Sequence, residues 1–196
     1  MRVSRLWWTG LVLTLVLPGC GGKAAVKGQR TVVETSQSGR PDWINKRSWE
    51  SGDRFYVVGT SGPVQDISLG EQIAELNGKR LIADYVGQQI RSQFDLALTG
   101  NPNADRVGKA VASCVSSRTD KVVVRGVLPV ERYWERYEIV GEDGISNGLE
   151  VSVIVGISKT DLEASKRGEL KALGQMEQIQ ADAEAKRLLE QFRTAP

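Results

Sequence analysis

The stretch Leu149–Ile157 constrains the fold more than any other part of the sequence. Its aliphatic residues alternate strictly with residues that are mostly polar or small, and they are Leu149, Val151, Val153, Val155 and Ile157. Such alternation describes a β-strand with one face on a core and the other mostly in water. Burial of each aliphatic side chain contributes roughly 1.5–3 kcal/mol. The sequence therefore predicts an antiparallel sheet with one buried face.

Three further segments have the composition of strands. Residues 54–60 (RFYVVGT) are aromatic and β-branched, with glycine-containing turns on both sides. Residues 121–127 (KVVVRGV) and 130–140 form a second strand that continues past Pro129, which marks a bend or bulge because proline has no N–H. The Asp-Gly and Asn-Gly pairs of residues 141–148 predict a hairpin turn.

Helical periodicity dominates the rest of the chain. A helix capped by Asp66 or Ser68 and running to about Phe94 has one apolar face, made of Leu69, Ile73, Leu76, Ala83, Ile90 and Phe94. A second strip contains Ala74, Leu81 and Tyr85, so we expect a sheet and another element to cover this helix. A shorter helix spans about 104–116. A last helical region begins after Ser158 or Thr160, with Gly168 and Gly174 as candidate breaks.

These elements predict an α/β (α+β) fold. We expect a small antiparallel three-stranded sheet, in strand-helix-strand-strand order, covered on one face by the long helix and a C-terminal helix. In residues 130–140, Tyr133, Tyr137 and Ile139 point one way, and Arg132, Trp134, Arg136 and Glu138 point the other. We expect the second set to cover the outer face of the sheet.

The N-terminus contains the most specific motif, Leu17-Pro18-Gly19-Cys20. It follows a basic start and an apolar run at residues 6–17, which is too short to span a bilayer comfortably but suits a secretory signal peptide. The cysteine at the cleavage point resembles the lipobox of bacterial lipoproteins, in which diacylglycerol is attached to the sulfur and the new amino terminus is acylated, commonly with palmitate. The alternative is an ordinary signal peptide with a chance cysteine.

The motif divides the chain into four parts. We expect a lipoprotein signal peptide at 1–19, a lipidated N-terminus with a flexible tether at 20–40, an α/β domain at 41–160, and a C-terminal helical tail at 161–196. Gly21 follows the cysteine, in place of the Asp that retains lipoproteins at the inner membrane of enterobacteria. We therefore expect outer-membrane attachment, on the periplasmic face or at the cell surface.

Composition argues against several classes of function. The chain has no histidine, so histidine-based catalysis and zinc sites are ruled out. Loss of Arg2 and Arg5 with the signal peptide leaves 24 basic and 24 acidic residues, which provides no electrostatic case for nucleic acid. The turn Gly59–Gly62 lacks the spacing and lysine of a phosphate-binding loop. We predict no enzyme, no catalytic residue, no metal and no cofactor, and we interpret Cys114 as a small buried residue.

Five aromatic or basic residues that we expect at the surface form a candidate partner surface: Trp43, Trp49, Arg132, Trp134 and Arg136. Trp43 and Trp49 suit either a plug over the core or a ligand-stacking surface. The charged residues around Trp134 suit either a solvated strand face or a partner-binding edge. The tail beyond Gly174 adds apolar residues without an evident cover, so we expect a protein partner or a homo-oligomer.

The order of these segments resembles a known family. A Pro41-Asp42-Trp43 start precedes the Phe55–Ser61 strand, and the helix that follows contains Ala74, Gly78 and Lys79–Ala83. This pattern, over about Pro41–Thr160, is similar to the Lpp-twenty family of outer-membrane lipoproteins, some of which are flagellum-associated. The resemblance implies a dodecin-like α/β domain held on the outer-membrane bilayer by acyl chains. It implies a structural or interaction role in the cell envelope, or a module binding a small or cell-wall ligand, and it transfers no catalytic residue.

Overall fold

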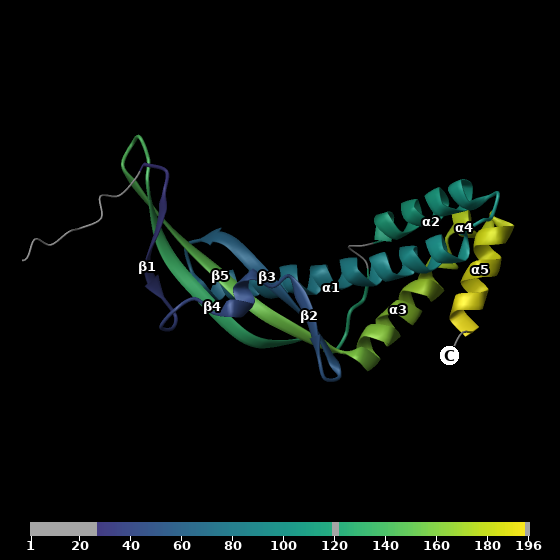
Figure 1. Ribbon diagram of the computed structural model, residues 1–196, viewed down its shortest axis with the longest axis horizontal. Helices are drawn as coiled ribbons and strands as arrows, with labels where there is room; N and C mark the ends of the chain where they lie inside the picture. Colours follow the sequence, from purple (N-terminus) through teal and green to yellow (C-terminus); the bar gives the residue numbers. More distant parts are fainter. Residues whose placement is uncertain (1–26, 119–121, 195–196) are drawn as a thin grey trace, which may run out of the picture.

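The computed structural model describes residues 27–118 and 122–194. Figure 1 shows an elongated molecule with a sheet at one end, a group of helices at the other, and α1 extending from one into the other. The elements are β1 (Arg30–Thr35), a 3-10 helix η1 (Asp42–Asn45), β2 (Ser48–Ser51), β3 (Arg54–Val64), α1 (Ile67–Ala97), α2 (Ala104–Arg118), β4 (Leu128–Val140), β5 (Ile145–Ser158), α3 (Lys159–Leu173), α4 (Glu177–Gln180) and α5 (Ala183–Thr194).

The sheet has five antiparallel strands in the order β1-β4-β5-β3-β2. β4 and β5 form a long hairpin, and Gly144, with φ of 124°, lies in its turn as the Asp-Gly pair predicted. The core side of β5 is the predicted one, because Leu149, Val151, Val153, Val155 and Ile157 are all buried in the sheet core. The α+β class is therefore confirmed.

The predicted three-stranded sheet is too small. Residues 30–35 were expected in the tether, yet they form the edge strand β1, and β2 forms the opposite edge. Residues 122–127 contain no strand, and the Lys121 end of that predicted strand lies outside the described residues. The valines of this stretch are used differently, since Val124 and Val127 pack on the sheet core and Val122 packs on the helical core. The predicted irregularity at Pro129 is present as a register shift between Pro129 and Glu131.

The long helix α1 matches its predicted span, with the Asp66 carboxylate accepting a hydrogen bond from the Leu69 N–H at 2.9 Å. Its orientation differs from the prediction. Gly70, Ala74 and Gly78 face the sheet, and a Cβ on Gly59 of β3 would collide with the carbonyl oxygen of Ala74. The backbones approach so closely that no larger residue fits.

This close approach turns the large residues of the first half of α1 outward. Leu69 is 49% exposed and Leu76 is 66% exposed, although both were predicted to lie in the core. Ile73, between them, is half-buried. In the second half of the helix the prediction is correct, because Ile90 and Phe94 are buried.

A second hydrophobic core holds the helical end together. The buried residues of α1's second half pack with α2, α3, α4 and α5. Gly174 ends α3, whereas Gly168 lies within it. The expectation that the tail lacks cover is wrong, because Ile179, Leu188 and Leu189 are buried and Phe192 contacts Phe94 edge-on at 4.9 Å. Residues 161–194 thus share a core with α1 and α2.

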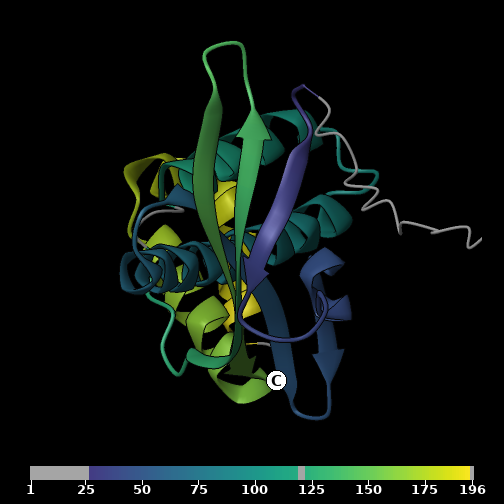
Figure 2. The same cartoon turned by 90° about the vertical axis from the view of Figure 1, so that its left-hand side faces the viewer.

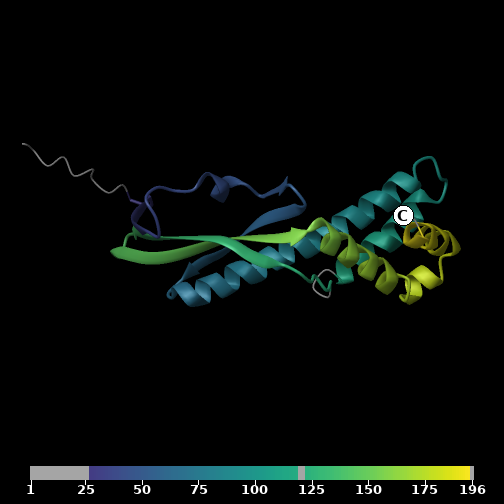
Figure 3. The same ribbon diagram turned by 90° about the horizontal axis from the view of Figure 1, so that it is seen from below.

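The two sets of β4 side chains face the opposite sides of the sheet from those predicted. Tyr133, Glu135 and Tyr137 are buried on the face opposite α1, while Arg132 and Trp134 pair with Val153 and Val151 and lie on the α1 side. The reason is visible in Figure 3, where residues 36–47 cross the outer face from β1 to β2. We call residues 36–47 the crossing segment. It covers the outer face, whereas α1 contacts β3 and β5 far more than β4 and leaves the α1 side of β4 partly open.

The close approach makes a stability prediction. Gly59→Ala should destabilise the protein by more than about 2 kcal/mol, because the added methyl group meets backbone atoms of Ala74 and Gly78. Gly168→Ala is the control, since nothing lies within 4 Å of its Cβ position, and it should stabilise α3 by about 0.5–1 kcal/mol. Urea denaturation followed by circular dichroism measures both. Equal stability of the two variants would contradict the close approach.

Candidate functional site

Cys20, the predicted lipid attachment residue, lies outside the described residues. The described chain begins at Lys27, at the sheet end of the molecule, where the Gly28 N–H donates to the Val140 carbonyl at 2.9 Å. Lys27 also forms an ion pair with Glu142 in the β4–β5 turn region at 2.7 Å. The chain therefore enters the fold beside the tip of the β4–β5 hairpin, far from the helical end (Figure 1).

The five residues of the predicted partner surface do not form one surface. Trp49 pairs with Tyr56 and stacks on it, with ring centroids 5.4 Å apart, on the outer face of the sheet. Trp43 lies on the same face and donates its indole N–H to Glu131 at 2.8 Å. Trp134 lies on the α1 side, where it packs on the sheet core. Trp134 therefore does not share a surface with Trp43 and Trp49.

Arg132 and Arg136 accompany Trp134 on the α1 side, and both have carboxylate partners. Arg132 donates to Glu71 of α1 at 2.9 Å, which ties β4 to the helix. Arg136 lies 3.5 Å from Glu34 of β1, and its guanidinium is 5.9 Å from the centre of the Trp134 ring. Because the side chains of Arg132 and Arg136 are 69% and 52% exposed, these pairs contribute little to stability and stay accessible to solvent.

An open groove of about 440 Å³ lies beside Arg136. Its lining includes Val33, Glu34, Val64, Arg136 and Leu149. The groove joins one acid, one base, two side-chain amides, the Tyr137 side chain and a few aliphatic groups. It is open to solvent and mixes charged, polar and apolar groups.

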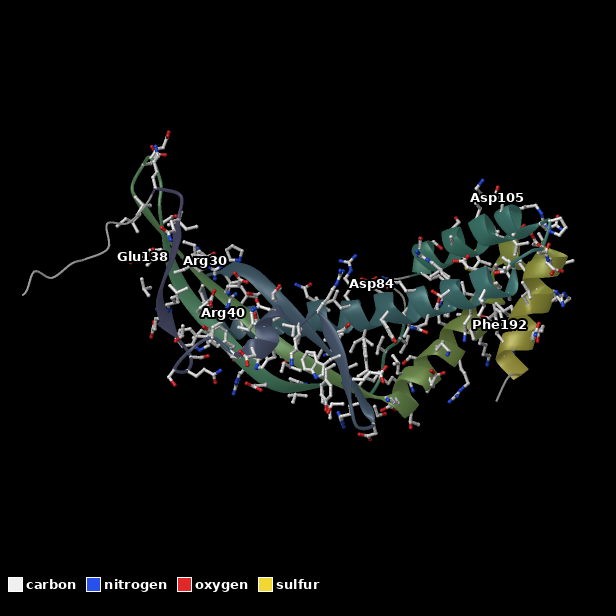
Figure 4. All side chains as sticks on the ribbon, in the orientation of Figure 1. Arg30, Arg40, Asp84, Asp105, Glu138 and Phe192 are labelled. Carbon is white, nitrogen blue, oxygen red and sulfur yellow. The ribbon has the colours of Figure 1, made fainter. Side chains whose placement is uncertain are left out.

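The most buried charged group of the sheet end is Glu135, which is 5% exposed on the outer face. It forms an ion pair with Arg30 of β1 and another with Arg40 of the crossing segment, at 3.6 Å. Tyr133 donates its hydroxyl to the same carboxylate at 3.2 Å. Figure 4 shows Arg30 and Arg40 together at this end of the molecule. The Glu135 carboxylate thus joins β4 to β1 and to the crossing segment.

Arg30 extends this cluster to a second carboxylate and a ring. It donates to Glu150 of β5 at 2.7 Å, and its guanidinium lies 3.7 Å from the centre of the Tyr137 ring. Burial and the neighbouring Glu135 charge raise the pKa of Tyr133, so its hydroxyl stays protonated and keeps donating. Because the carboxylate oxygens of Glu135 are engaged by partners, the arrangement serves as a structural clamp on β1 and the crossing segment.

A comparable clamp fixes the helical end. Arg118, at the end of α2, donates to the buried Glu169 of α3 from Nε at 2.6 Å and from a terminal nitrogen at 3.2 Å. The hydrogen bond to Glu169 raises the pKa of Arg118. This two-pronged geometry is the strong form of an arginine–carboxylate pair. It positions α2 on α3.

The described residues contain no candidate metal site and no candidate membrane span. Across 27–118 and 122–194, no group of three or more cysteine and carboxylate side chains is arranged to hold a metal ion. No helix in the same ranges is long and apolar enough to cross a bilayer. Cys114 is fully buried in the helical core, as predicted, with its sulfur 3.0 Å from the Gln178 side-chain oxygen.

Sequence reasoning missed one surface, the bare half of α1 that presents Leu69, Ile73 and Leu76. Periodicity correctly placed these residues on one face of a helix, but it assigned that face to the core. Figure 3 shows no other element on the side of this half of α1 that faces away from the sheet. The signal that would have corrected the assignment is the Gly70, Ala74, Gly78 spacing, which marks the face of closest approach.

Comparison with known proteins provides no independent guide. Neither a family model, nor a curated protein, nor a solved structure matches this chain.

The environment of Cys114 predicts its reactivity. Burial raises the pKa of the Cys114 thiol, so the thiolate fraction at neutral pH is smaller than for a free cysteine. We expect no maleimide labelling of Cys114 in the native protein at pH 7, and full labelling after denaturation, measured by mass spectrometry. Rapid native labelling would contradict the buried position.

The Glu135 clamp makes a second prediction. Glu135→Gln should lower the free energy of unfolding by about 1–3 kcal/mol, because the change weakens bonds to Arg30, Arg40 and Tyr133 at a buried position. Glu142→Gln is the matched control, since Glu142 and its partner Lys27 are largely exposed, and it should change stability by less than about 0.5 kcal/mol. Indistinguishable melting curves for the two variants would show that the clamp is unimportant.

Proposed function

We propose that this chain is a lipid-anchored protein of the bacterial cell envelope, with a structural or interaction role, attached to the outer membrane through Cys20. The observation that carries the proposal is the Leu17-Pro18-Gly19-Cys20 motif, which directly follows a short apolar run and a basic start. Three parts of this proposal rest on the resemblance alone. They are membership of the Lpp-twenty family, a dodecin-like character of the domain and association with a flagellum.

The way the chain enters the fold is compatible with such an anchor. Lys27 follows Cys20 by seven residues, and seven residues span at most about 25 Å. The tether is therefore shorter than the 20–40 segment expected from composition, because β1 takes up residues 30–35. A lipid on Cys20 would hold the hairpin end of the molecule near the bilayer and leave the helical end farther away.

The described surfaces favour interaction over catalysis. The charged residues of the two clamps are committed to partners within the chain, and the groove beside Arg136 is open and mixes charged, amide, aromatic and aliphatic groups. The proposal therefore includes no catalytic residue, cofactor or metal. A role as a binding module for a small or cell-wall ligand is less favoured, because Trp43 and Trp49 lie on the opposite face from Trp134.

Lipidation is tested by metabolic labelling. Cells given radiolabelled palmitate should incorporate it into the wild-type protein and not into Cys20→Ala, because the thioether can form only at the cysteine sulfur and acylation of the new amino terminus follows from it. The control is Cys114→Ala, which removes the other cysteine and should label like the wild type. Equal labelling of wild type and Cys20→Ala would reject the anchor.

Sorting gives a second test of the same proposal. The wild-type protein should separate with outer-membrane fractions on a density gradient, since Gly21 is not the inner-membrane retention signal. In an enterobacterial host, Gly21→Asp should move it to inner-membrane fractions, with Gly22→Asp as the position-matched control. Wild-type protein in the inner membrane would contradict the outer-membrane assignment.

A further inference from the structure

A cleft of about 330 Å³ lies between the middle of α1 and the sheet edge formed by β2 and β3. Its lining comes from the end of the crossing segment, from both strands and from α1. Figure 1 shows β2 and β3 beside the middle of α1, and Figure 2 shows β2 as the outermost strand on this side of the sheet. Small-molecule sites have volumes of roughly 300–1,000 Å³, so the cleft has the size for a small ligand.

The floor of the cleft is apolar and fixed by packing. Phe55 and Val57 of β3 are 4% and 3% exposed and belong to the sheet core. Phe55 stacks on Tyr85 of α1, with ring centroids 4.3 Å apart. Leu81, one turn before Tyr85, is half-buried against the same core. The floor therefore offers one aromatic and one aliphatic surface to an apolar group.

Two opposite charges line this cleft, and they are not paired with each other. Arg47, the last residue of the crossing segment, is exposed, and Asp84 of α1 is half-buried. Within residues 27–118 and 122–194 neither forms an ion pair, and the Asp84 carboxylate accepts no hydrogen bond. In the groove beside Arg136, by contrast, the acid and the base pair with each other. A half-buried carboxylate needs donors, so those for Asp84 come from solvent or from a ligand.

The helix presents its part of the cleft from one side. Leu81, Asp84, Tyr85 and Gln88 recur at intervals of three and four residues, which places their side chains on one face of α1. Figure 4 shows Asp84 midway along this helix. Gln88 adds a side-chain amide, and Ser48 of β2 adds a hydroxyl at the sheet edge. A few polar groups around an apolar floor are the usual composition of a small-molecule site.

We propose that this cleft binds a small zwitterion with an apolar side group, which is the chemistry of a free α-amino acid or a short peptide. The Arg47 guanidinium binds the ligand carboxylate, and the Asp84 carboxylate accepts hydrogen bonds from the ligand ammonium group. The apolar side group rests on Leu81 and Tyr85. An anion alone would lie near Asp84, and a cation alone near Arg47, so a ligand with both charges fits better than either.

The proposed site goes beyond the envelope role and is independent of the lipid anchor. It contains none of the three tryptophans, whose separation weakened the case for a ligand-binding module. Failure of palmitate labelling would reject the anchor and leave the binding measurement unaffected. Failure of ligand binding would reject this site and leave the anchor unaffected.

Isothermal titration calorimetry of the purified full-length protein tests the site. Three probes carry both charges: L-leucine, L-phenylalanine and L-leucyl-L-leucine. L-leucinamide lacks the carboxylate, and N-acetyl-L-leucine lacks the ammonium group. We expect saturable binding of a zwitterionic probe at millimolar concentration or below, and at least about tenfold weaker binding of each one-charge probe than of L-leucine, because each leaves one charged group of the site unpaired. Tighter binding of the dipeptide than of the amino acids would identify a peptide ligand, and the reverse order a free amino acid.

Two variants test the assigned contacts. Arg47→Gln should abolish the preference for L-leucine over L-leucinamide, and Asp84→Asn the preference for L-leucine over N-acetyl-L-leucine, because each removes the group that recognises the missing charge. Lys46→Gln and Asp95→Asn are the controls and should bind like the wild type. Lys46 lies over the Trp49 ring on the outer face, and Asp95 lies on α1 outside the cleft. Circular dichroism melting shows that each variant is folded.

Three results would overturn the proposal. Absence of saturable binding for all three zwitterionic probes would reject the site. Equal affinity for L-leucine and the two one-charge probes would show apolar contact without recognition of charge. Wild-type binding by folded Arg47→Gln and Asp84→Asn would place the ligand elsewhere on the protein.

Discussion

The fold depends on how closely α1 approaches the sheet. Gly59 of β3 lies against the backbone of Ala74 and Gly78, and the Cβ positions of Gly70 and Gly78 are already occupied by Val151 and Val155 side chains. Glycine in a helix interior costs about 1 kcal/mol relative to alanine, and here that cost accompanies a contact that larger residues would prevent. Because the small residues face the sheet, the large ones of the same helical segment, Leu69 and Leu76, are exposed. The exposure of Leu69 and Leu76 is thus a consequence of the packing beneath them.

The outer face of the sheet is held by ion pairs and hydrogen bonds to a buried carboxylate. It is covered by the crossing segment and by β1, which are joined to β4 through the buried carboxylate of Glu135. A buried carboxylate requires partners that replace its water, and Arg30, Arg40 and Tyr133 supply them. This requirement explains why β4 presents Tyr133 and Tyr137 to that side, while the side shared with α1 carries Arg132 and Arg136.

Much of the fold could be predicted from the sequence, and the failures have physical causes. The alternation of β5 and the spans of α1 and α2 were predicted, because local periodicity reports them directly. β1 was missed, because RTVVET is short and polar and becomes a strand only through pairing with β4. The valines of 122–127 suggested a strand, but they pack on the cores and have no sheet partner. The sides of β4 were exchanged, because alternation identifies two sets of residues without saying which set faces the helix. Among the candidate site residues, Cys20 lies beyond the described part. The five residues of the predicted partner surface were assigned to one surface although they occupy two faces of the sheet.

The central claim is that α1 rests on the sheet by its small residues and presents its large aliphatic residues to solvent. It is tested most directly by comparing Ala74→Leu with Leu76→Ser in urea denaturation at a concentration low enough to keep the chain monomeric. The account predicts that Ala74→Leu lowers the free energy of unfolding by about 2 kcal/mol or more, because Ala74 is fully buried against Gly59. It predicts a change of less than about 1 kcal/mol for Leu76→Ser, since Leu76 is 66% exposed. A large loss for Leu76→Ser together with a tolerated Ala74→Leu would contradict the account.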